Sequence, residues 1–496
     1  MPGPYDRTRR FLARVTDDPD AAAARMAAVD VDIVAARLSP AVETAIALTT
    51  TLLLRLDEAA PRLHVDVPAT RTTRLPRLSD GNLVDEVATE HAGFSSVDRL
   101  SASRSADPAL RLVFDGKDDG VVVGTAGWAC AIGERLPDVP GNPIAAAFAG
   151  TLASAEALKV ALAAAGTTAR SRRWRGVVSL WDYALAPTIG TPIPDVVDLD
   201  GVVFVGCGGI ASAIAWPLAL LTLAGAPLAV DDDTIDDTNP NRHLTASIRD
   251  VGEEKAELLA GLLRPAGAAP VVQPVRWDTV DPARRAAVEL GVVSVDDDAI
   301  RRQFQLDMPR LVLNGGTSDA GFYQVTSHDF ITEACLGCIA RADLHSGGPD
   351  ESLARRLRIP LGELRPHLGS SAPLPDELLA RVAAEDRELL RGVAGRDVAR
   401  VACGHLRPLP DEPAVSAPML SAAPGVLLAA ELVKRRMGAE APLSPRTNMV
   451  ATSILTGPHE RWARCIHKRT DCTCQDPAYR AFYRSRWQDG AAQEAS

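Results

Sequence analysis

Residues 201–233, GVVFVGCGGIASAIAWPLALLTLAGAPLAVDDD, decide the fold. An apolar strand-like run leads through a glycine turn into a predicted helix over 211–223, and a second strand then ends in three aspartates. This strand–helix–strand order predicts one unit of a doubly wound parallel sheet. Apolar runs at 271–275, 291–295 and 311–314 continue the pattern, so we predict a Rossmann-like α/β fold.

The turn carries glycines at Gly206, Gly208 and Gly209. Glycines are needed where φ is positive and where backbone N–H groups approach a phosphate at a helix N-terminus. A carboxylate of Asp231 or Asp233, at the end of the second strand, is expected to bind a ribose hydroxyl. This much of the pattern predicts an ATP site and an NAD site equally well.

The residues that follow favour ATP. Asn239 and Arg242 lie just beyond the acidic strand end, and Lys255 lies thirteen residues after Arg242. A dehydrogenase has no use for these groups there, whereas an enzyme that holds a triphosphate needs cations for the charge on its non-bridging oxygens. Read separately, Arg242 and Lys255 would be ordinary solvated surface charges; read together with the glycines and aspartates, they indicate a triphosphate site.

The combined run GCGGIA…VDDDTIDDTNPNRHL…DVGEEKAE resembles the ThiF/MoeB and ubiquitin-activating enzyme superfamily. The resemblance covers roughly 200–340 and 415–476, and it includes VVSVDDDAIRRQF, in which Asp296 and Arg301 match the family's magnesium-binding Asp and a downstream Arg. This sequence departs from the family pattern at three positions. They are Ala211 for the third glycine, His243 for a glutamine, and Pro240 for a leucine.

The resemblance implies an ATP- and Mg²⁺-dependent adenylyltransferase. Asp231 and Asp233 would contact ribose and adenosine, Asn239, Arg242 and Lys255 would hold the phosphates, and Asp296 would hold Mg²⁺. The expected substrate is the C-terminal carboxylate of a small ubiquitin-like protein or a peptide, and a conjugating enzyme is a further expected partner.

Two more residues are candidates on the same ground. Arg7, in Tyr5-Asp6-Arg7, matches a family Tyr-x-Arg that reaches the phosphates from a partner subunit or a second half-domain; the alternative is a frayed basic terminus. Cys403 lies where the superfamily's thioester-forming cysteine lies when there is one, and the alternative is a small buried residue.

Four cysteines form two close pairs, Cys335 with Cys338 and Cys472 with Cys474. Two such pairs from remote parts of a chain are typical of a tetrahedral structural Zn²⁺ site, and the family resemblance also implies zinc there. Because the second pair is C-x-C where the family has C-x-x-C, Cys465 or His467 is an alternative ligand.

The sequence predicts a chain built from two halves. Residues 142–162 and 417–437 share a proline, small residues and then Ala-Glu-x-x-Lys; chance similarity of two Ala-rich helices is the alternative. We therefore expect three parts, listed with their boundaries: a degenerate adenylation-like domain at 1–195, an active adenylation domain at 196–340 and 411–496, and a helical insertion at 341–410. Residues 20–60 are expected to be helical.

A formal net charge of −11 argues against a general nucleic-acid binder. No apolar run has the length of a membrane span and the N-terminus lacks a signal peptide, so we expect a cytoplasmic protein with no membrane partner. A homodimer, or a pseudo-dimer of the two halves, is expected. The competing hypotheses are a nucleotide (NAD)-dependent oxidoreductase and a catalytically silent scaffold of the activating-enzyme type.

Overall fold

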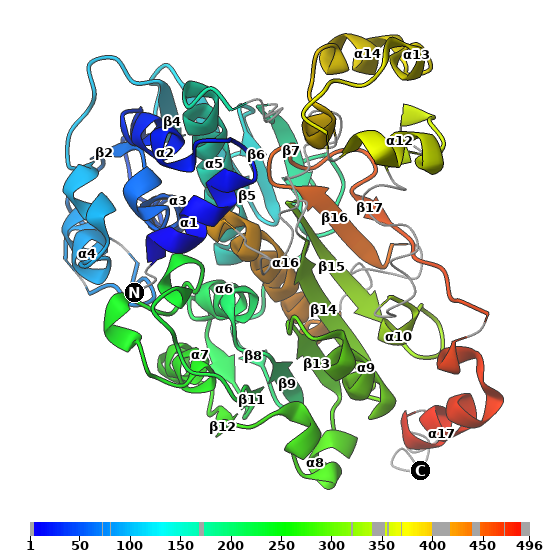
Figure 1. Cartoon of the computed structure of the whole chain (residues 1–496). Coiled ribbons are helices and arrows are strands. Elements are labelled where there is room, and N and C mark those ends of the chain that lie inside the picture. Colours follow the sequence, from blue (N-terminus) through cyan, green and yellow to red (C-terminus); the bar gives the residue numbers. More distant parts are fainter. Residues whose placement is uncertain are drawn as a thin grey trace.

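The computed structural model describes most of the 496-residue chain, and Figure 1 shows its arrangement. The residues that it does not describe are 1–3, 72, 80, 168–172, 319–320, 340–352, 355–356, 369, 399–416, 439–446, 471 and 488–496. We call residues 4–195 the N-terminal half and residues 196–487 the C-terminal half. Each half contains one large β-sheet.

The sheet of the C-terminal half has the order β12-β11-β9-β13-β14-β15-β16-β17. Its strands are β9 (Val202–Val205), β11 (Leu228–Val230), β12 (Val271–Gln273), β13 (Leu290–Val293), β14 (Leu311–Thr317), β15 (Phe322–His328), β16 (Met449–Ser453) and β17 (Ala463–Arg464). The first five in this order are parallel, and the last three are antiparallel. Counted along the chain, the parallel strands have the order 3-2-1-4-5 of a dinucleotide-binding sheet, so the predicted Rossmann-like α/β class agrees with the structure.

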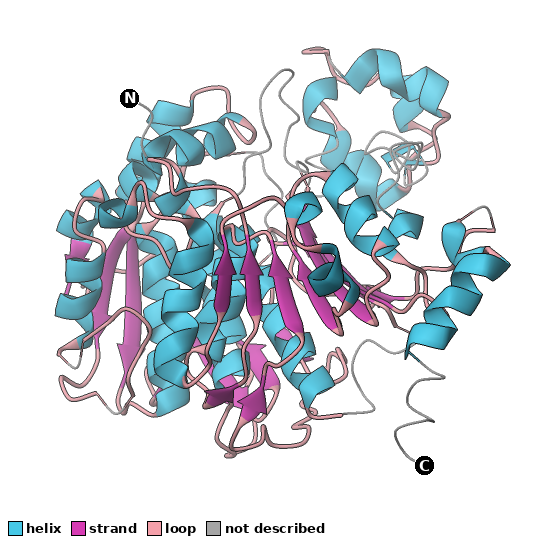
Figure 2. Cartoon of the chain, turned by 90° about the horizontal axis from the view of Figure 1, so that it is seen from below, coloured by secondary structure: helices cyan, strands magenta, loops and turns pink. Residues whose placement is uncertain are grey.

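One predicted element is shorter than expected. The helix predicted over 211–223 is α6 (Gly209–Leu218), and Leu223–Ala224 is instead a short strand, β10, paired with β8 (Val197–Asp198). Pro217 lies inside the last turn and lacks an N–H group, which weakens the helix at this point. The strand β9 is buried along its whole length because helices cover both faces of the sheet (Figure 2).

The sheet of the N-terminal half has the order β3-β2-β1-β4-β5-β6-β7. Its strands are β1 (Asp30–Ala35), β2 (Arg62–Asp66), β3 (Leu100–Ser101), β4 (Leu110–Asp115), β5 (Val121–Ala126), β6 (Ala129–Ile132) and β7 (Gly176–Ser179). Its first five strands are parallel and again follow the order 3-2-1-4-5. The prediction that 20–60 is helical was wrong for β1, whose apolar residues pair on both sides with parallel strands.

The helices that belong to these sheets are α1 (Pro4–Ala13), α2 (Pro19–Ala27), α3 (Pro40–Leu54), α4 (Leu83–Glu90), α5 (Pro143–Ala164), α7 (Lys255–Leu263), α8 (Pro282–Ala286), α9 (Asp298–Leu306), α10 (Leu336–Ile339) and α16 (Pro418–Arg436). In the N-terminal half α5 packs on α3, and in the C-terminal half α16 packs on α6 and on the strands β14 and β15 (Figure 1). The helices α5 and α16 also pack on each other. One hydrophobic core therefore runs through both halves.

From the sequence we expect no apolar run of membrane-spanning length, but the helix α5 is long and apolar enough to cross a membrane by its length and composition. In its most apolar 18-residue window, 94% is buried inside the protein. Its neighbours α3 and α16 cover it, so α5 is a core helix of this fold.

Two smaller parts lie at the periphery. Residues 353–398 include α12 (Leu361–Leu368), α13 (Asp376–Leu379) and α14 (Ala384–Leu390), which surround a small leucine-rich core of their own. Arg396 of this part forms an ion pair of 3.1 Å with Asp17 of the N-terminal half. The last described helix, α17 (Pro477–Trp487), packs its Tyr483 on Phe330, with 5.6 Å between the ring centroids.

Candidate functional site

The glycine turn lies between β9 and α6. Gly206 has φ +84°, and a Cβ atom on it would lie 2.8 Å from Val295 Cγ1, so only glycine fits there. Gly208 is the N-cap of α6 and offers no side-chain hydrogen bond to the first turn of the helix. No atom lies within 4 Å of the position of a Cβ on Gly208. There is thus open space beside Gly208, and no side chain caps the first turn of α6.

Asp231, at the end of β11, holds this turn in shape. Its Oδ2 accepts a hydrogen bond from Cys207 N at 2.5 Å, and its Oδ1 accepts one from Asp233 N at 2.9 Å. Burial raises the pKa of the Asp231 carboxyl above its usual value, against the effect of these two hydrogen bonds. Asp231 therefore contacts the backbone of the turn, whereas the side chain of Asp233 is 68% exposed at the end of the strand.

Lys255 reaches the same edge of the sheet from the first residue of α7. Its Nζ lies 2.7 Å from Asp233 Oδ2, and its backbone N–H donates to Asp233 O at 3.1 Å. The ammonium group of Lys255 is thus held close to the exposed carboxylate of Asp233, for which the sequence predicts contact with a nucleotide ribose.

Arg242 lies directly over the glycine turn. A Cβ atom on Gly209 would be 3.1 Å from Arg242 Cγ and from Arg242 O, so the absence of a side chain on Gly209 lets the two segments meet. Burial lowers the pKa of Arg242, and the carboxylates of Asp236 and Asp296 oppose that shift. Asp296 is exposed just past the carboxyl end of β13. Arg242, Lys255 and Asp296 are therefore gathered at one edge of the sheet.

A short 3₁₀ helix, Asn239–Asn241, precedes Arg242 and positions it. Asp236 Oδ1 accepts hydrogen bonds from the backbone N–H groups of Thr238 at 2.7 Å and Asn239 at 2.9 Å. Asn239 is 4% exposed, so it lies beneath the surface of the site.

Arg7 comes to this edge from the N-terminal half. Its Nε donates to Thr238 Oγ1 at 2.8 Å. Burial, followed by repulsion from Arg242, lowers the pKa of Arg7 to about 10. Arg7 belongs to the helix α1, so the structure places it on a packed element. Within the part of the chain that the structure describes, neither Arg7 nor Arg242 forms an ion pair with a carboxylate.

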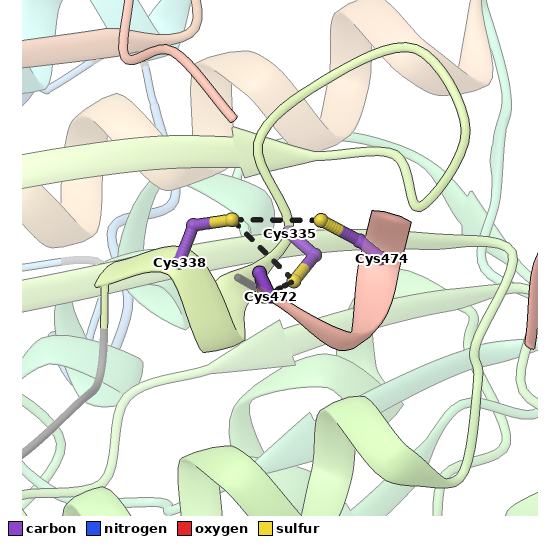
Figure 3. Close-up of side chains that lie close together, drawn as sticks. All are labelled: Cys335, Cys338, Cys472 and Cys474. Atoms are coloured by element: carbon purple, nitrogen blue, oxygen red, sulfur yellow. Dashed lines mark hydrogen bonds between the residues drawn. The ribbon is translucent and has the colours of Figure 1, made fainter. Parts of the chain in front are cut away.

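The four cysteines of the predicted zinc site come together (Figure 3). Their sulfur atoms all lie within 4.8 Å of one another, with 3.5 Å from Cys335 to Cys472, 3.5 Å from Cys338 to Cys474, and 3.9 Å from Cys335 to Cys338. Thiolates about 2.3 Å from a tetrahedral Zn²⁺ lie about 3.8 Å apart, so these four sulfurs fit such an ion. All four side chains are buried.

The other candidates have different positions. Cys465 lies outside this group and its Sγ is 3.6 Å from Ile466 O, and His467 is also not part of the group. Arg301 pairs with Asp298 at 2.7 Å. Cys403 lies outside the described residues.

The sequence reasoning missed several residues that hold the site together. Thr238 accepts the hydrogen bond from Arg7, and Arg55 and Arg77 of the N-terminal half donate to backbone oxygens near Arg242. No short motif contains these residues, because each contact joins positions more than 160 residues apart.

No protein-family model matches this sequence. Among curated proteins, the chain is similar to an uncharacterized protein of Sinorhizobium fredii, y4jF. The two are 26% identical over 389 residues, which cover 74% of each chain.

Among solved structures, the chain is similar to E. coli MccB. The structure of MccB with MccA-N7isoASN has a TM-score of 0.34 and 17% identity, and the match covers 56% of this chain and 67% of that one. MccB alone has a TM-score of 0.34 and 16% identity, with 55% and 64% covered. MccB with ATP has a TM-score of 0.35 and 16% identity, with 56% and 65% covered.

Proposed function

We propose that this chain is an adenylyltransferase that binds ATP with Mg²⁺ at the edge formed by the glycine turn, Arg7, Arg242 and Lys255. A substrate carboxylate, ionised at pH 7, attacks the α-phosphorus of ATP. The bond from that phosphorus to the bridging oxygen of the β-phosphate breaks. The products are an acyl adenylate and pyrophosphate.

One observation carries the proposal. Arg7 and Arg242 come from opposite halves of the chain and lie close enough to repel each other. Among the described residues neither forms an ion pair with a carboxylate, although the charge of Asp236 attracts both. Two partly buried guanidinium groups stay together at this cost when an anion neutralises both. The uncapped N-terminus of α6 and the open space beside Gly208 supply room and N–H donors for a phosphate.

The other residues have supporting roles in this proposal. Asp231 shapes the turn, and Asp233 is exposed where a ribose hydroxyl would bind. Lys255 contacts Asp233 and would move to a phosphate oxygen when ATP is bound. The exposed carboxylate of Asp296, beside Arg242, would hold Mg²⁺, and Asn239 would hold a phosphate. The magnesium ion, when bound, neutralises charge on the phosphates.

We extend the proposal to the substrate and to the two halves. The carboxylate belongs to the C-terminus of a small ubiquitin-like protein or a peptide. As a proposed second step, the thiolate of Cys403 attacks the acyl carbon of the adenylate, which forms a thioester and releases AMP. Residues 1–195 form an inactive copy of the adenylation fold, because both sheets begin with the same strand order whereas only the C-terminal half has a glycine turn. In this scheme one chain is a pseudo-dimer and carries its own Arg7.

The test is ATP binding by calorimetry, followed by ATP–pyrophosphate exchange with candidate small proteins or peptides encoded near this chain. We expect Arg242→Ala to lower exchange by about 10²- to 10³-fold, the usual effect of removing one preorganised donor to a transition-state anion. Arg62→Ala is the control, since Arg62 forms its ion pair with Asp30 at the remote sheet of the N-terminal half. Tight NAD binding that is unchanged in Arg242→Ala would instead show an oxidoreductase-type site.

We also propose that Cys335, Cys338, Cys472 and Cys474 hold a structural Zn²⁺ that ties α10 to the segment before α17. Metal analysis of the purified protein is expected to give one zinc per chain, and Cys472→Ser is expected to remove it. Cys465→Ser is the matched control and should keep the full zinc content. Zinc loss in Cys465→Ser would contradict the four-sulfur assignment.

A further inference from the structure

The loop that carries Arg242 lies against the N-terminal half of the chain. Asn241, beside Arg242, is 0% exposed. Its Nδ2 donates to Thr8 Oγ1 at 3.0 Å and to Arg55 O at 2.6 Å. Thr8 follows Arg7 on α1, so the same contact also brings Arg7 to the site.

Arg55 is the centre of this contact. It ends α3 and is 1% exposed. Its Nη1 donates to Pro240 O and, at 3.0 Å, to His243 O, and its Nη2 donates to Ala246 O at 2.9 Å. These three carbonyls belong to the turns on either side of Arg242.

Among the described residues, no carboxylate forms an ion pair with Arg55. Burial lowers the pKa of this group to about 10, and the charges of Glu90 and Asp250 oppose that shift. A buried guanidinium is expensive unless its N–H groups are satisfied. Here the backbone oxygens of the loop accept hydrogen bonds from Nη1 and Nη2, while Nε has no hydrogen-bond partner among the described residues. The loop in turn depends on Arg55, because any shift of residues 240–246 leaves a buried cation with fewer hydrogen bonds.

A second arginine of the N-terminal half extends the contact. Arg77 donates through Nη1 to Thr245 O at 2.8 Å, and its Nη2 lies 2.8 Å from Asp250 Oδ2. Arg77 itself has φ +64°, an uncommon conformation for a residue with a side chain.

We propose that Arg55 is a positioning residue for the ATP site: it fixes the backbone on both sides of Arg242, and so holds that guanidinium over the glycine turn. The N-terminal half has no glycine turn of its own. It then contributes to the site through the buried side chain of Arg55 as well as through Arg7. The expected effect of Arg55 on ATP binding rests on the proposed function. Its effect on the backbone of residues 240–246 does not depend on ATP.

The chain offers a matched control for Arg55. Arg99 also donates to three backbone oxygens, those of Asp57 at 3.2 Å, Glu58 at 2.9 Å and Ala60 at 3.2 Å. All three belong to the N-terminal half and are remote in sequence from the loop. Replacing Arg99 therefore removes the same number of arginine–carbonyl contacts without touching residues 240–246.

The experiment compares wild-type protein with Arg55→Met, Arg55→Lys and Arg99→Met by hydrogen exchange of peptides that cover residues 236–250. Exchange in these peptides should rise in Arg55→Met, rise less in Arg55→Lys, and stay unchanged in Arg99→Met. Unchanged exchange of the loop in a folded Arg55→Met protein overturns the proposal. If Arg55→Met does not fold, the same comparison is made with Arg55→Lys.

The effect on ATP is measured by calorimetry with Mg²⁺ present. Arg55→Met should weaken ATP binding about tenfold or more, as expected when a binding group is displaced by a fraction of its ideal position. In an Arg242→Ala background the same change should have little further effect, because Arg55 acts through Arg242. Equal weakening in both backgrounds overturns the proposal. Absence of ATP binding in the wild-type protein refutes the proposed function. In that case, hydrogen exchange of residues 236–250 still tests whether Arg55 holds the loop.

Discussion

The carboxyl edges of β1 and β9 occupy the same place in two sheets of the same strand order, yet they differ in chemistry. After β9 the chain turns through Gly206, and Gly208 is the N-cap of α6 without a side-chain hydrogen bond to the helix. After β1 the chain has no glycine, and α3 begins at Ser39, whose Oγ accepts a hydrogen bond from Val42 N at 3.3 Å. In the N-terminal half a side chain thus caps the N-terminus of α3. In the C-terminal half no side chain caps the N-terminus of α6, so its N–H groups can bind a ligand.

The two halves agree in another place, the Ala-Glu-x-x-Lys stretch of their long helices. Lys159 Nζ lies 2.5 Å from Glu156 Oε1 in α5, and Lys434 Nζ lies 2.6 Å from Glu431 Oε1 in α16. Both ion pairs are buried. The comparison teaches that the two halves share buried interactions that build the fold and differ where a ligand would bind.

The largest expected effect tests the buried Lys–Glu ion pair that the two halves share. Lys434→Met leaves Glu431 buried without its cation, and we expect a loss of about 3–5 kcal/mol in unfolding free energy, measured by urea unfolding. Lys159→Met should cause a loss of similar size, if the two halves are equivalent here. The double variant Glu431→Gln/Lys434→Met removes both charges and should recover part of the loss; no recovery would contradict this account.

The next effect tests the difference between the two helix ends. Gly208→Asp places a capping carboxylate in the open space before α6, and we expect ATP affinity to fall about 100-fold, or about 2.7 kcal/mol. The melting temperature should not fall, because Gly208 has φ −78° and tolerates a side chain. Ser39→Asp makes the matched change before α3 and should leave ATP binding as it is. Equal ATP affinity in Gly208→Asp and wild type would place the nucleotide elsewhere.

A pH effect sharpens the comparison further. Burial lowers the pKa of His243 to about 3, and its Nε2 lies 2.8 Å from Cys207 O under the glycine turn. The folded state therefore disfavours the protonated form, and stability falls as pH drops below the unfolded pKa near 6.5 toward 3. His243→Gln keeps a donor for Cys207 O and should remove a dependence of about 1.4 kcal/mol per pH unit in this window.

The measurement is urea unfolding of both proteins at pH 7 and at pH 5. His91 and His328 titrate in the wild type and the variant alike, so the difference between the two proteins isolates His243. A parallel pH dependence of the two proteins would show that His243 is charged in the fold.

The smallest effect is expected in the N-terminal half, at the sheet edge that corresponds to the proposed ATP site of the C-terminal half. Arg37 lies just after β1 and pairs with Asp115 at 3.2 Å, and its side chain is 85% exposed. Exposed pairs contribute little, so Arg37→Ala should change the melting temperature by less than about 1 °C and leave ATP binding unchanged. A clear loss of ATP affinity would mean that this edge also binds nucleotide.

Much of the fold was predictable because it depends on local patterns. The strands after residue 200 lie close to their predicted bounds, and α5 (Pro143–Ala164) matches the Ala-rich stretch 142–162. The strand β1 was missed, because its apolar run lies between two Ala-rich helices and reads as a continuation of them. The predicted helix 211–223 was too long, because the pairing of β10 with β8 is a tertiary contact.

The sequence by itself determined which residues could form a phosphate site: the glycines, the aspartates, Arg242 and Lys255 lie within fifty residues, where spacing along strands and helices sets their positions. It also indicated the two cysteine pairs but left Cys465 and His467 open as alternative ligands; the structure brings the sulfurs of Cys335, Cys338, Cys472 and Cys474 together. Only the tertiary structure decided that Asp231 holds the turn, that Arg7 meets Arg242, and that Arg55 holds the loop between them. Those contacts join distant segments through buried hydrogen bonds, and no local pattern encodes which distant carbonyl a guanidinium will reach.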